Sequence, residues 1–493
     1  MNNQATTARI DPIGTHTKPP SAAIKRLLPW LVAVAYFMES LDTTVLNTAV
    51  PVIARAMGVA PLSMKAVLAS YTLSLAIFIP VSGWMADRFG TRQVFGCAIG
   101  LFTSASFLCG ISDNVYLLVA CRVLQGCGGA MMVPVGRLTL VRTFDKSEIV
   151  RVLSFVTIPG WIGPILGPVV GGFIVAHLHW GYIFFVNLPI GILGLILVLL
   201  YLPDYREKEK KPFDIAGFIL FGSGIAILSY VLEIFGEHIL TPGETVVLLA
   251  VSLALIGAYG VHSLRTSSPL LDLSLFRIRT FSVSVMGSFF SRLGVGGVPF
   301  LLPLLYQLAL GFTPMQSGLL IMPQALAGIV AKLALPGLLA RFGYRQVLMA
   351  NTVLMGLLLM LFATVGSGTP VWVIVVQACC YGACTSLQYT TMNTMAYADI
   401  GEHKLSSAGS IASTAQELSI SFGIAAAGLI TAMFIPGHVS AESSRMMSLG
   451  LHEAFLVLGG LTILSTLIFS KLKDEDGGNV VHHQQVQMRR GYR

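Results

Sequence analysis

Charged residues are scarce in this chain of 493 residues: only 11% are Asp, Glu, Lys or Arg, against roughly 25% in soluble domains. Signatures of catalysis are missing as well. There is no Walker motif, so ATP does not drive the protein directly, and His452-Glu453 lacks the second histidine of the zinc-protease helix. Gly126-x-Gly128-Gly129 lies inside an apolar run rather than after a strand, so it is no nucleotide loop. We therefore expect no enzyme and no cofactor.

Cysteine is also used sparingly, and all seven cysteines lie inside apolar runs. Buried thiols there act more often as small apolar fillers than as disulfide partners. Cys379, Cys380 and Cys384 have no histidine or carboxylate at ligand spacing, so we expect no metal site.

The chain is rich in long hydrophobic segments. Of all residues 55% are hydrophobic, and runs of about 20 apolar residues, each able to cross a bilayer core of roughly 30 Å, recur throughout. Such continuous runs exclude a porin-like barrel, whose strands show short alternating patterns. The fold class is an all-α polytopic membrane protein. We predict fourteen spans near 28–50, 64–84, 94–112, 115–140, 152–176, 181–202, 214–235, 244–264, 281–309, 315–338, 345–366, 370–396, 407–434 and 450–470.

Basic residues decide the orientation. With the N-terminus inside, cytoplasmic loops and tails hold about 24 of the 31 Lys and Arg residues. The opposite side holds Arg55, Lys65 and Arg445. This positive-inside bias places both termini in the cytoplasm, and it accounts for the net charge of +8 without a nucleic-acid partner. The polar segment 1–27 is read as a short cytoplasmic tail rather than a cleavable signal peptide.

One charged loop occurs twice. The windows Arg88–Val94 and Arg341–Val347 agree at every position except Thr91 against Tyr344. Both lie between spans on the cytoplasmic side, after spans 2 and 10. The repeat predicts two pseudo-symmetric six-helix bundles, residues 28–202 and 281–470, with a basic loop, two inserted helices and a link at 203–280. Residues 471–493 form a cytoplasmic tail.

Four motifs in order carry a family resemblance. They are Gly83-x-Met-Ala-Asp87-Arg88-x-Gly90-Thr-Arg92, Leu41–Pro51, Arg122–Ala130 and Gly163-Pro164-x-x-Gly167-Pro168-x-x-Gly171-Gly172. Trp180–Gly191 is a fifth match, with Gly181 where a basic residue is common, and Thr91 departs in the same way from the first motif. Over residues 28–470 the chain resembles the major facilitator superfamily, and within it the fourteen-helix drug:proton antiporter branch, closest to its multidrug exporters.

The resemblance implies a proton-coupled exporter of small amphipathic compounds that works by alternating access. Its partners are small-molecule substrates, protons and the lipid bilayer, and we expect a monomer in the inner membrane of a bacterium. A transporter of one specific metabolite on the same fold is the alternative. A membrane-embedded enzyme or sensor would need a reactive cluster or a soluble domain, which the sequence does not contain.

Asp42 is the first candidate for proton coupling, because a carboxyl group inside a membrane span is functional by default. Glu39 lies one turn earlier on the same helix face. Arg122 reaches a depth on the order of 10 Å from the outer end of its span, as Asp42 does by the same arithmetic. Burial favours the neutral acid and a nearby arginine the ionised one, so the pair suits a proton cycle. A purely structural ion pair would use the same residues; the resemblance favours the functional reading.

The second half has its own buried charges. Arg292 and Glu417 each lie near mid-membrane, roughly 15 Å from the cytoplasmic end of their spans. They could bind substrate or protons, or form a structural ion pair, since buried charges must find some partner. Lys332 lies further along, before the second copy of the loop.

Two motifs suggest gating rather than chemistry. Asp87, in the loop of Gly83, Arg88, Gly90 and Arg92, could pair with an arginine or a helix N-terminus in one conformation only, and so latch the halves. A solvated turn is the alternative. The repeat has Ala340 in place of Asp87. In span 5, Gly163, Gly167, Gly171 and Gly172 allow close helix contact, while Pro164 and Pro168 bend the helix.

Overall fold

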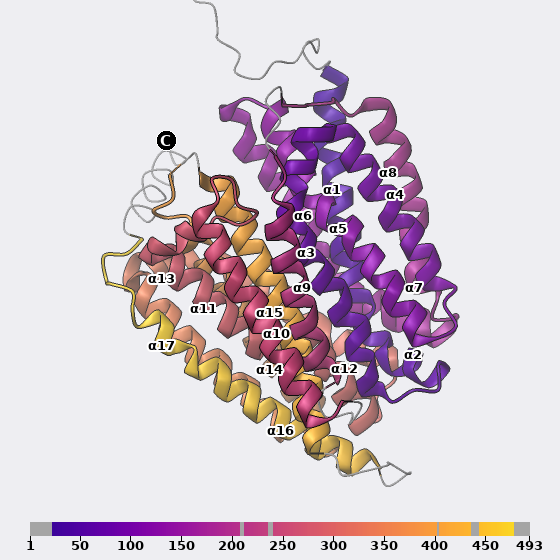
Figure 1. The fold of residues 1–493 in the computed structure, drawn as a ribbon. Helices are drawn as coiled ribbons and strands as arrows, with labels where there is room; N and C mark the ends of the chain where they lie inside the picture. Colours follow the sequence, from indigo (N-terminus) through magenta and orange to yellow (C-terminus); the bar gives the residue numbers. More distant parts are fainter. Residues whose placement is uncertain (1–21, 208–211, 235–239, 402–403, 435–442, 478–493) are drawn as a thin grey trace, which may run out of the picture.

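The computed structural model describes residues 22–207, 212–234, 240–401, 404–434 and 443–477, and every regular element in these ranges is helical. Of the predicted segments, most of the N-terminal tail, part of the basic loop (208–211) and most of the C-terminal tail (478–493) lie outside the described residues. The chain is coloured by sequence in Figure 1.

Among the described residues, the first part of the chain contains eight α-helices and two short 3-10 helices. They are α1 (Ala22–Val45), η1 (Asn47–Ala49), α2 (Val50–Ala56), η2 (Pro61–Met64), α3 (Lys65–Phe89), α4 (Thr91–Gly110), α5 (Val115–Thr143), α6 (Lys146–His177), α7 (Tyr182–Phe185) and α8 (Asn187–Tyr201). Two helices follow, α9 (Ile215–Ile234) and α10 (Pro242–Arg265).

The remainder begins with the short turn η3 (Leu273–Arg277). It continues with α11 (Arg279–Val295), α12 (Val298–Leu304), the π-helical turn η4 (Leu305–Ala309), α13 (Pro314–Leu361), η5 (Phe362–Thr364), α14 (Val371–Ala396), α15 (Leu405–Met433), α16 (Ser443–Leu464) and α17 (Thr466–Phe469).

Twelve of the described helical segments are long and apolar enough to cross a membrane. The prediction was fourteen spans, and the difference lies in two places. Helix α1, which carries Glu39 and Asp42, is not among the twelve. Helix α13 counts once although its 48 residues would measure about 72 Å, more than twice a bilayer core. Gly343, with φ 72° and ψ 169°, breaks it inside the repeated loop.

Helices pack both on neighbours in sequence and on helices far from them in the chain. In the first part α1 packs on α6, and α5 packs on both α3 and α4; in the last part α13 packs on α14 and α16, and α11 on α15. The two parts meet where α3 packs on α15 and α6 on α13. Helices α9 and α10 pack on each other, and α9 also contacts α3 and α15. In Figure 1, α4 and α8 lie on one side and α13 and α17 on the other.

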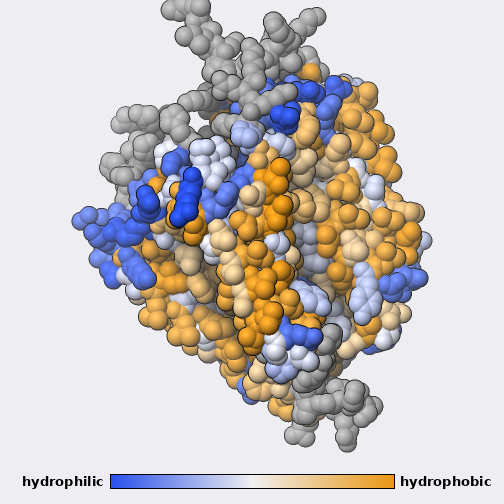
Figure 2. Space-filling view, viewed as in Figure 1, coloured by the Kyte–Doolittle hydropathy of each residue, from blue (hydrophilic) through white to orange (hydrophobic). Residues whose placement is uncertain are grey.

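Apolar and polar residues occupy different parts of the surface. Hydrophobic side chains cover the middle of the face seen in Figure 2, and hydrophilic ones gather towards its upper and lower ends. Exposed large apolar residues are frequent, as in α10, where Val246, Val247 and Leu253 are each more than half exposed. Hydrocarbon rather than water suits such a surface, because lipid tails are as apolar as these side chains.

Candidate functional site

A buried charge pair joins α1 to α5. Asp42 and Arg122 are each 1% exposed, and Arg122 Nη1 lies 2.5 Å from Asp42 Oδ2. The two residues are 80 positions apart in the chain. The predicted pairing is present in this structure. Taking two charges out of water costs several kcal/mol per ion, which excellent geometry and further hydrogen bonds must offset.

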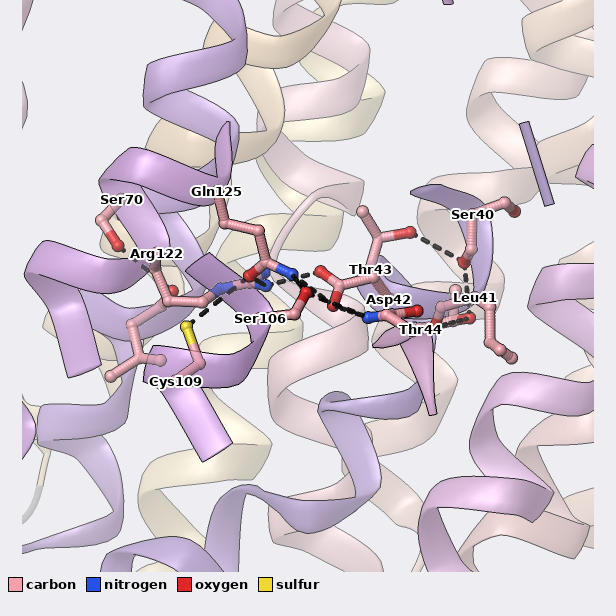
Figure 3. Close-up of polar contacts among 12 residues, drawn as sticks. Ser40, Leu41, Asp42, Thr43, Thr44, Ser70, Ser106, Cys109, Arg122 and Gln125 are labelled. Carbon is pink, nitrogen blue, oxygen red and sulfur yellow. Dashed lines mark hydrogen bonds and ion pairs between the residues drawn. The ribbon is translucent and has the colours of Figure 1, made fainter. Parts of the chain in front are cut away.

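Those further hydrogen bonds come from two amide side chains. Asp42 Oδ1 accepts from Gln125 Nε2 and from Asn187 Nδ2, both at 2.8 Å. Gln125 also accepts from Arg122 Nη1 at 2.7 Å and donates to Ser106 Oγ at 2.7 Å. Figure 3 shows the Gln125 and Ser106 side chains beside Asp42. The Asp42 carboxylate of α1 therefore binds side chains of α5 and α8, and Ser106 of α4 joins the network through Gln125.

An aromatic ring completes the surroundings of Arg122. Its guanidinium carbon lies 4.1 Å from the centre of the Tyr71 ring on α3, a cation–π arrangement. Close approach of α3 and α5 makes this contact possible: a Cβ on Gly126 would come within 2.7 Å of the Tyr71 carbonyl oxygen. Arg122 Nε is buried and has no hydrogen-bond partner among the described residues. The guanidinium is thus held chiefly through Nη1 and the ring.

Two hydroxyl side chains of α1 donate hydrogen bonds to backbone oxygens of α6. Ser40 Oγ donates to Gly160 O at 2.7 Å, and Thr44 Oγ1 donates to Gly163 O at 3.1 Å. The first of these acceptors is available because Pro164, four residues on, has no N–H with which to close the helical bond to Gly160. Pro164 therefore both bends α6 and leaves the Gly160 oxygen free to accept the bond from Ser40 of α1.

The glycines of α6 divide between two neighbours. A Cβ on Gly163, Gly167 or Gly171 would come within 2.4 Å of atoms of α1, whereas a Cβ on Gly172 would lie 2.5 Å from Pro314 O at the start of α13. Pro168 O likewise faces Gly318 of α13. Of the four predicted gating glycines in α6, three thus pack within the first half, and Gly172 packs against the second.

In the second half, Arg292 on α11 is buried, with 4% of its surface exposed. Its guanidinium carbon is 3.5 Å from the centre of the Tyr389 ring, and its Nε donates to Ser288 Oγ at 3.0 Å. Glu417 on α15 is half-buried and interacts electrostatically with Arg292, but no ion pair of 4.0 Å or less joins them in the described part of the chain. The expected alternative of a tight structural Arg–Glu pair is not formed here.

Glu39 on α1 lies close enough to Glu417 of α15 for their charges to interact. Its carboxyl interacts electrostatically with Glu417 and with Asp42, and its buried Oε2 has no hydrogen-bond partner among the described residues. Lys332 on α13 lies with Nζ 4.1 Å from the Trp161 ring of α6. Charged side chains of α1, α11, α13 and α15 therefore approach the contact between the two halves.

The repeated loop binds the chain that follows each half. Asp87 Oδ1 lies 2.8 Å from Arg142 Nη2 at the end of α5, and Arg142 also reaches Glu207 at 3.3 Å. Arg92 N donates to Asp204 Oδ1 at 3.2 Å. Arg88 and Gly83 are exposed, and Gly90 has φ 96°. All these partners of Asp87 and Arg92 belong to the first half or to the chain directly after it.

The second copy of the loop is held in the same way. Gly343 takes the place of Gly90, and Arg345 Nη1 lies 3.0 Å from Asp474 Oδ1, in the segment after α17. Thr91 and Tyr344, the one difference between the two windows, are both buried. Thr91 Oγ1 donates to Pro203 O at 3.1 Å, whereas Tyr344 packs against the backbone at Gly477. In each half, the segment that follows the last helix therefore binds that half's copy of the repeated loop.

Three residues of the Asp42 network were not among the predicted site residues. Gln125 lies one turn after Arg122 in a motif that had been recognised, and Asn187 lies in another. Spacing could have found Gln125, because residues three apart share a helix face. Ser106 carries no sequence signal, since a serine in an apolar run is common.

Comparison with known proteins agrees with this architecture. The profile of the Major Facilitator Superfamily matches residues 32–424 and 285–485. A protein of Escherichia coli O157:H7 (strain EC4115 / EHEC) named "Putative multidrug resistance protein MdtD" is 38% identical over 451 residues, 92% of this chain and 95% of that protein. The protein of that name from Pectobacterium atrosepticum is 38% identical over 443 residues, covering 90% and 95%.

Solved structures with the same fold include transporters of low sequence identity. The POT family transporter PepTSo gives a TM-score of 0.68 at 15% identity, covering 95% of this chain and 99% of that one. A D-xylose-proton symporter gives 0.66 at 15% identity, covering 92% and 99%.

The resemblance found in the sequence is therefore confirmed, and the protein is a transporter rather than an enzyme. By its sequence, its helical architecture and its relatives, the chain belongs to the major facilitator superfamily.

Proposed function

We propose that this protein is a proton-coupled exporter, a drug:proton antiporter that moves small amphipathic compounds out of the cell by alternating access. The buried Asp42–Arg122 pair carries the proposal, because it is a titratable group inside the membrane domain with a single charged partner. Relatives that are 38% identical over nine-tenths of the chain are named as multidrug resistance proteins, which supports the substrate class.

The proposed topology has fourteen spans. Helix α1 and the two parts of α13 on either side of Gly343 bring the twelve apolar segments to that number. Residues 28–202 and 281–470 form two related six-helix bundles, α9 and α10 are inserted between them, and 1–27 and 471–493 are tails. We propose that the protein lies in a bacterial inner membrane with both termini in the cytoplasm, which the positive-inside bias supports. We propose a monomer.

Asp42 is the proposed coupling group. Ionised, it holds Arg122, Gln125 and Asn187 together and so fixes α1 against α5 and α8. A proton on Oδ2 would remove the charge that Arg122 binds and turn an acceptor into a donor. Release of the proton restores the pair. The four helices then favour different arrangements in the two states, which is the differential interaction that coupling requires.

Glu39, Arg292 and Glu417 are the proposed substrate-facing charges. They lie on α1, α11 and α15, and none of them has a salt bridge of 4.0 Å or less among the described residues. Tyr389 offers an aromatic face beside Arg292. A charged group on an amphipathic compound can meet such residues while its apolar part contacts rings.

Gating is assigned to the loop and to α6. Asp87, Arg88, Gly90, Arg92 and Gly83 form the loop that binds Arg142 and the segment after α8. Gly163, Pro164, Gly167, Pro168, Gly171 and Gly172 set how closely α6 approaches α1 and α13. The contact of α6 with α13 at Gly172 joins the two halves, so it must change when one half moves relative to the other. The loop would act within the first half, by fixing the ends of α3 and α5 against the segment after α8.

The test is efflux from proteoliposomes under an imposed pH gradient, with several unrelated lipophilic compounds. Wild-type protein should extrude them faster when the gradient is present. Asp42→Asn should abolish the response to the gradient, while the exposed-site control Asp474→Asn should keep it. Full, gradient-dependent transport by Asp42→Asn would exclude Asp42 as the coupling group. Transport of one solute alone would favour the alternative, a transporter of a specific metabolite.

A further inference from the structure

Two irregular helical segments face each other between the halves. Helix α1 ends at Val45 and gives way to the 3-10 turn η1, and in the second half α12 gives way to the π-helical turn η4. Each break lies near a proline, Pro51 and Pro303, which cannot supply the helical N–H. Segment η1 packs against α12 and α13, so the breaks meet at the contact between the halves. Single π-helical turns occur frequently at functional sites.

One side chain joins these segments. Gln307, in η4, donates from Nε2 to the backbone oxygen of Thr48, in η1, at 2.8 Å, across 259 positions of sequence. Thr48 is fully buried. Its side chain is fastened to the first half, because Thr48 Oγ1 lies 3.3 Å from Pro168 O on α6. Thr48 is therefore bound to its own half through its hydroxyl and to the other half through its carbonyl.

The Gln307–Thr48 bond lies only a short distance along the chain from Asp42. Thr48 follows Asp42 by six residues, a rise of about 9 Å along a helix. Between them Thr44 Oγ1 donates to Gly163 O, so α1 is attached to α6 along this stretch. A shift of α1 that accompanies loss of the Asp42–Arg122 pair would therefore also displace Thr48 and its bond to the second half.

A second contact shows that this end of the molecule is where the halves adhere. Ser421 Oγ on α15 donates to Ala69 O on α3 at 3.2 Å. A Cβ on Gly172 would lie 2.5 Å from Pro314 O. Ala69, Gly172 and Pro314, like Thr48, lie near helix ends remote from the Asp87 loop, and Ser421 lies about midway along α15. In Figure 1, α2 and α12 approach each other at that end.

We propose that Gln307 is a positioning residue whose amide, bound to the Thr48 carbonyl, transmits the state of the Asp42–Arg122 pair to the second half and holds the halves together at this end. This role rests on the proposed function, in which the pair changes state during transport. Gln307 suits it because an amide nitrogen donates at every pH and its bond can form or break without a change of charge.

The experiment is hydrogen exchange followed by mass spectrometry on the full chain in nanodiscs. In Gln307→Leu, exchange in peptides covering 47–60 and 305–313 should rise about fivefold, the effect of one ordinary hydrogen bond. The matched control is Gln377→Leu. Gln377 Nε2 also bonds a backbone oxygen, that of Leu358, but within the second half, and its loss should leave 47–60 unchanged.

Transmission is tested by combining the change with Asp42→Asn. Asp42→Asn should accelerate exchange in 305–313 when Gln307 is present and should add nothing in Gln307→Leu, a non-additive result typical of coupled sites. Should Asp42→Asn not fold, Asn187→Leu replaces it, because it removes one donor to Asp42 without removing the charge. Unchanged exchange in Gln307→Leu, or additive effects of the two changes, would overturn the proposal.

Efflux measurements keep the two proposals apart. If wild-type protein shows no proton-coupled transport while Gln307→Leu still loosens both segments, the proposed function fails and the structural bond stands. If transport is coupled in the wild type and Gln307→Leu leaves both coupling and exchange unchanged, the proposed function stands and the role of Gln307 is refuted.

Discussion

The free energy stored in the Asp42–Arg122 pair can be measured by a double-mutant cycle. Asp42→Asn leaves the guanidinium buried without a counter-charge and also sets an amide N–H₂ against donors from Gln125 and Asn187. Removing one partner of a buried pair costs about 3–5 kcal/mol, so this variant should lose about that much stability.

Arg122→Leu should be milder. The remaining Asp42 keeps two amide donors, and a proton can neutralise it, so we expect a loss of about 1–3 kcal/mol. The double variant removes both charges, and it should lie well below the sum of the single losses, because an apolar or neutral replacement of both members is often tolerated.

The assay is reversible unfolding in detergent at one pH, with denaturant as the variable. The control cycle uses Arg345 and Asp474, whose side chains are 36% and 73% exposed, and each single change there should cost about 0–1 kcal/mol. If the Asp42 and Arg122 losses add to within about 0.5 kcal/mol, the two charges do not stabilise each other and the reasoning fails.

Three further changes test other parts of the structure. Gly171→Ala would bring a Cβ within 2.2 Å of Val45 O and should cost about 1–3 kcal/mol, whereas Gly194→Ala, with no atom within 4 Å, should be neutral or stabilising; equal effects would contradict the packing. Asp87→Asn should slow efflux while the unfolding midpoint changes little, because its partner Arg142 keeps Glu207 at 3.3 Å; an unchanged efflux rate would favour a merely solvated turn. Glu417→Gln should weaken efflux of cationic compounds more than of neutral ones, measured as initial rates, and an equal loss for both would indicate a structural role.

Much of the fold could be predicted because membrane spans are long and continuous. A bilayer requires every backbone group to be bonded within the span, so each apolar run becomes a helix. The repeat of Arg88–Val94 at Arg341–Val347 also came from sequence, and both copies lie at breaks between helices with a left-handed glycine. The number of spans was less certain at α1, because Glu39 and Asp42, the carboxyl residues proposed for coupling, weaken its apolar signal.

The contacts of the candidate site could be predicted from the sequence only in part. Equal depth in two spans predicted that Asp42 and Arg122 would meet, because depth follows from residue number and helical rise. Rotation of each helix about its axis does not follow from depth. The contributions of Ser106 and Asn187 therefore remained invisible, although both are buried beside Asp42.

Sequence by itself determined the membrane class, the helical segments, the repeated loop and the presence of charges that a bilayer cannot leave unpartnered. It did so because these features depend on local composition and on rise along a helix. Tertiary structure alone decided the partners: Asp87 with Arg142, three of the glycines of α6 with α1, and Gln307 with Thr48. Those contacts join residues up to 259 positions apart, and only the packing of helices, which fixes their rotation and spacing, brings them together.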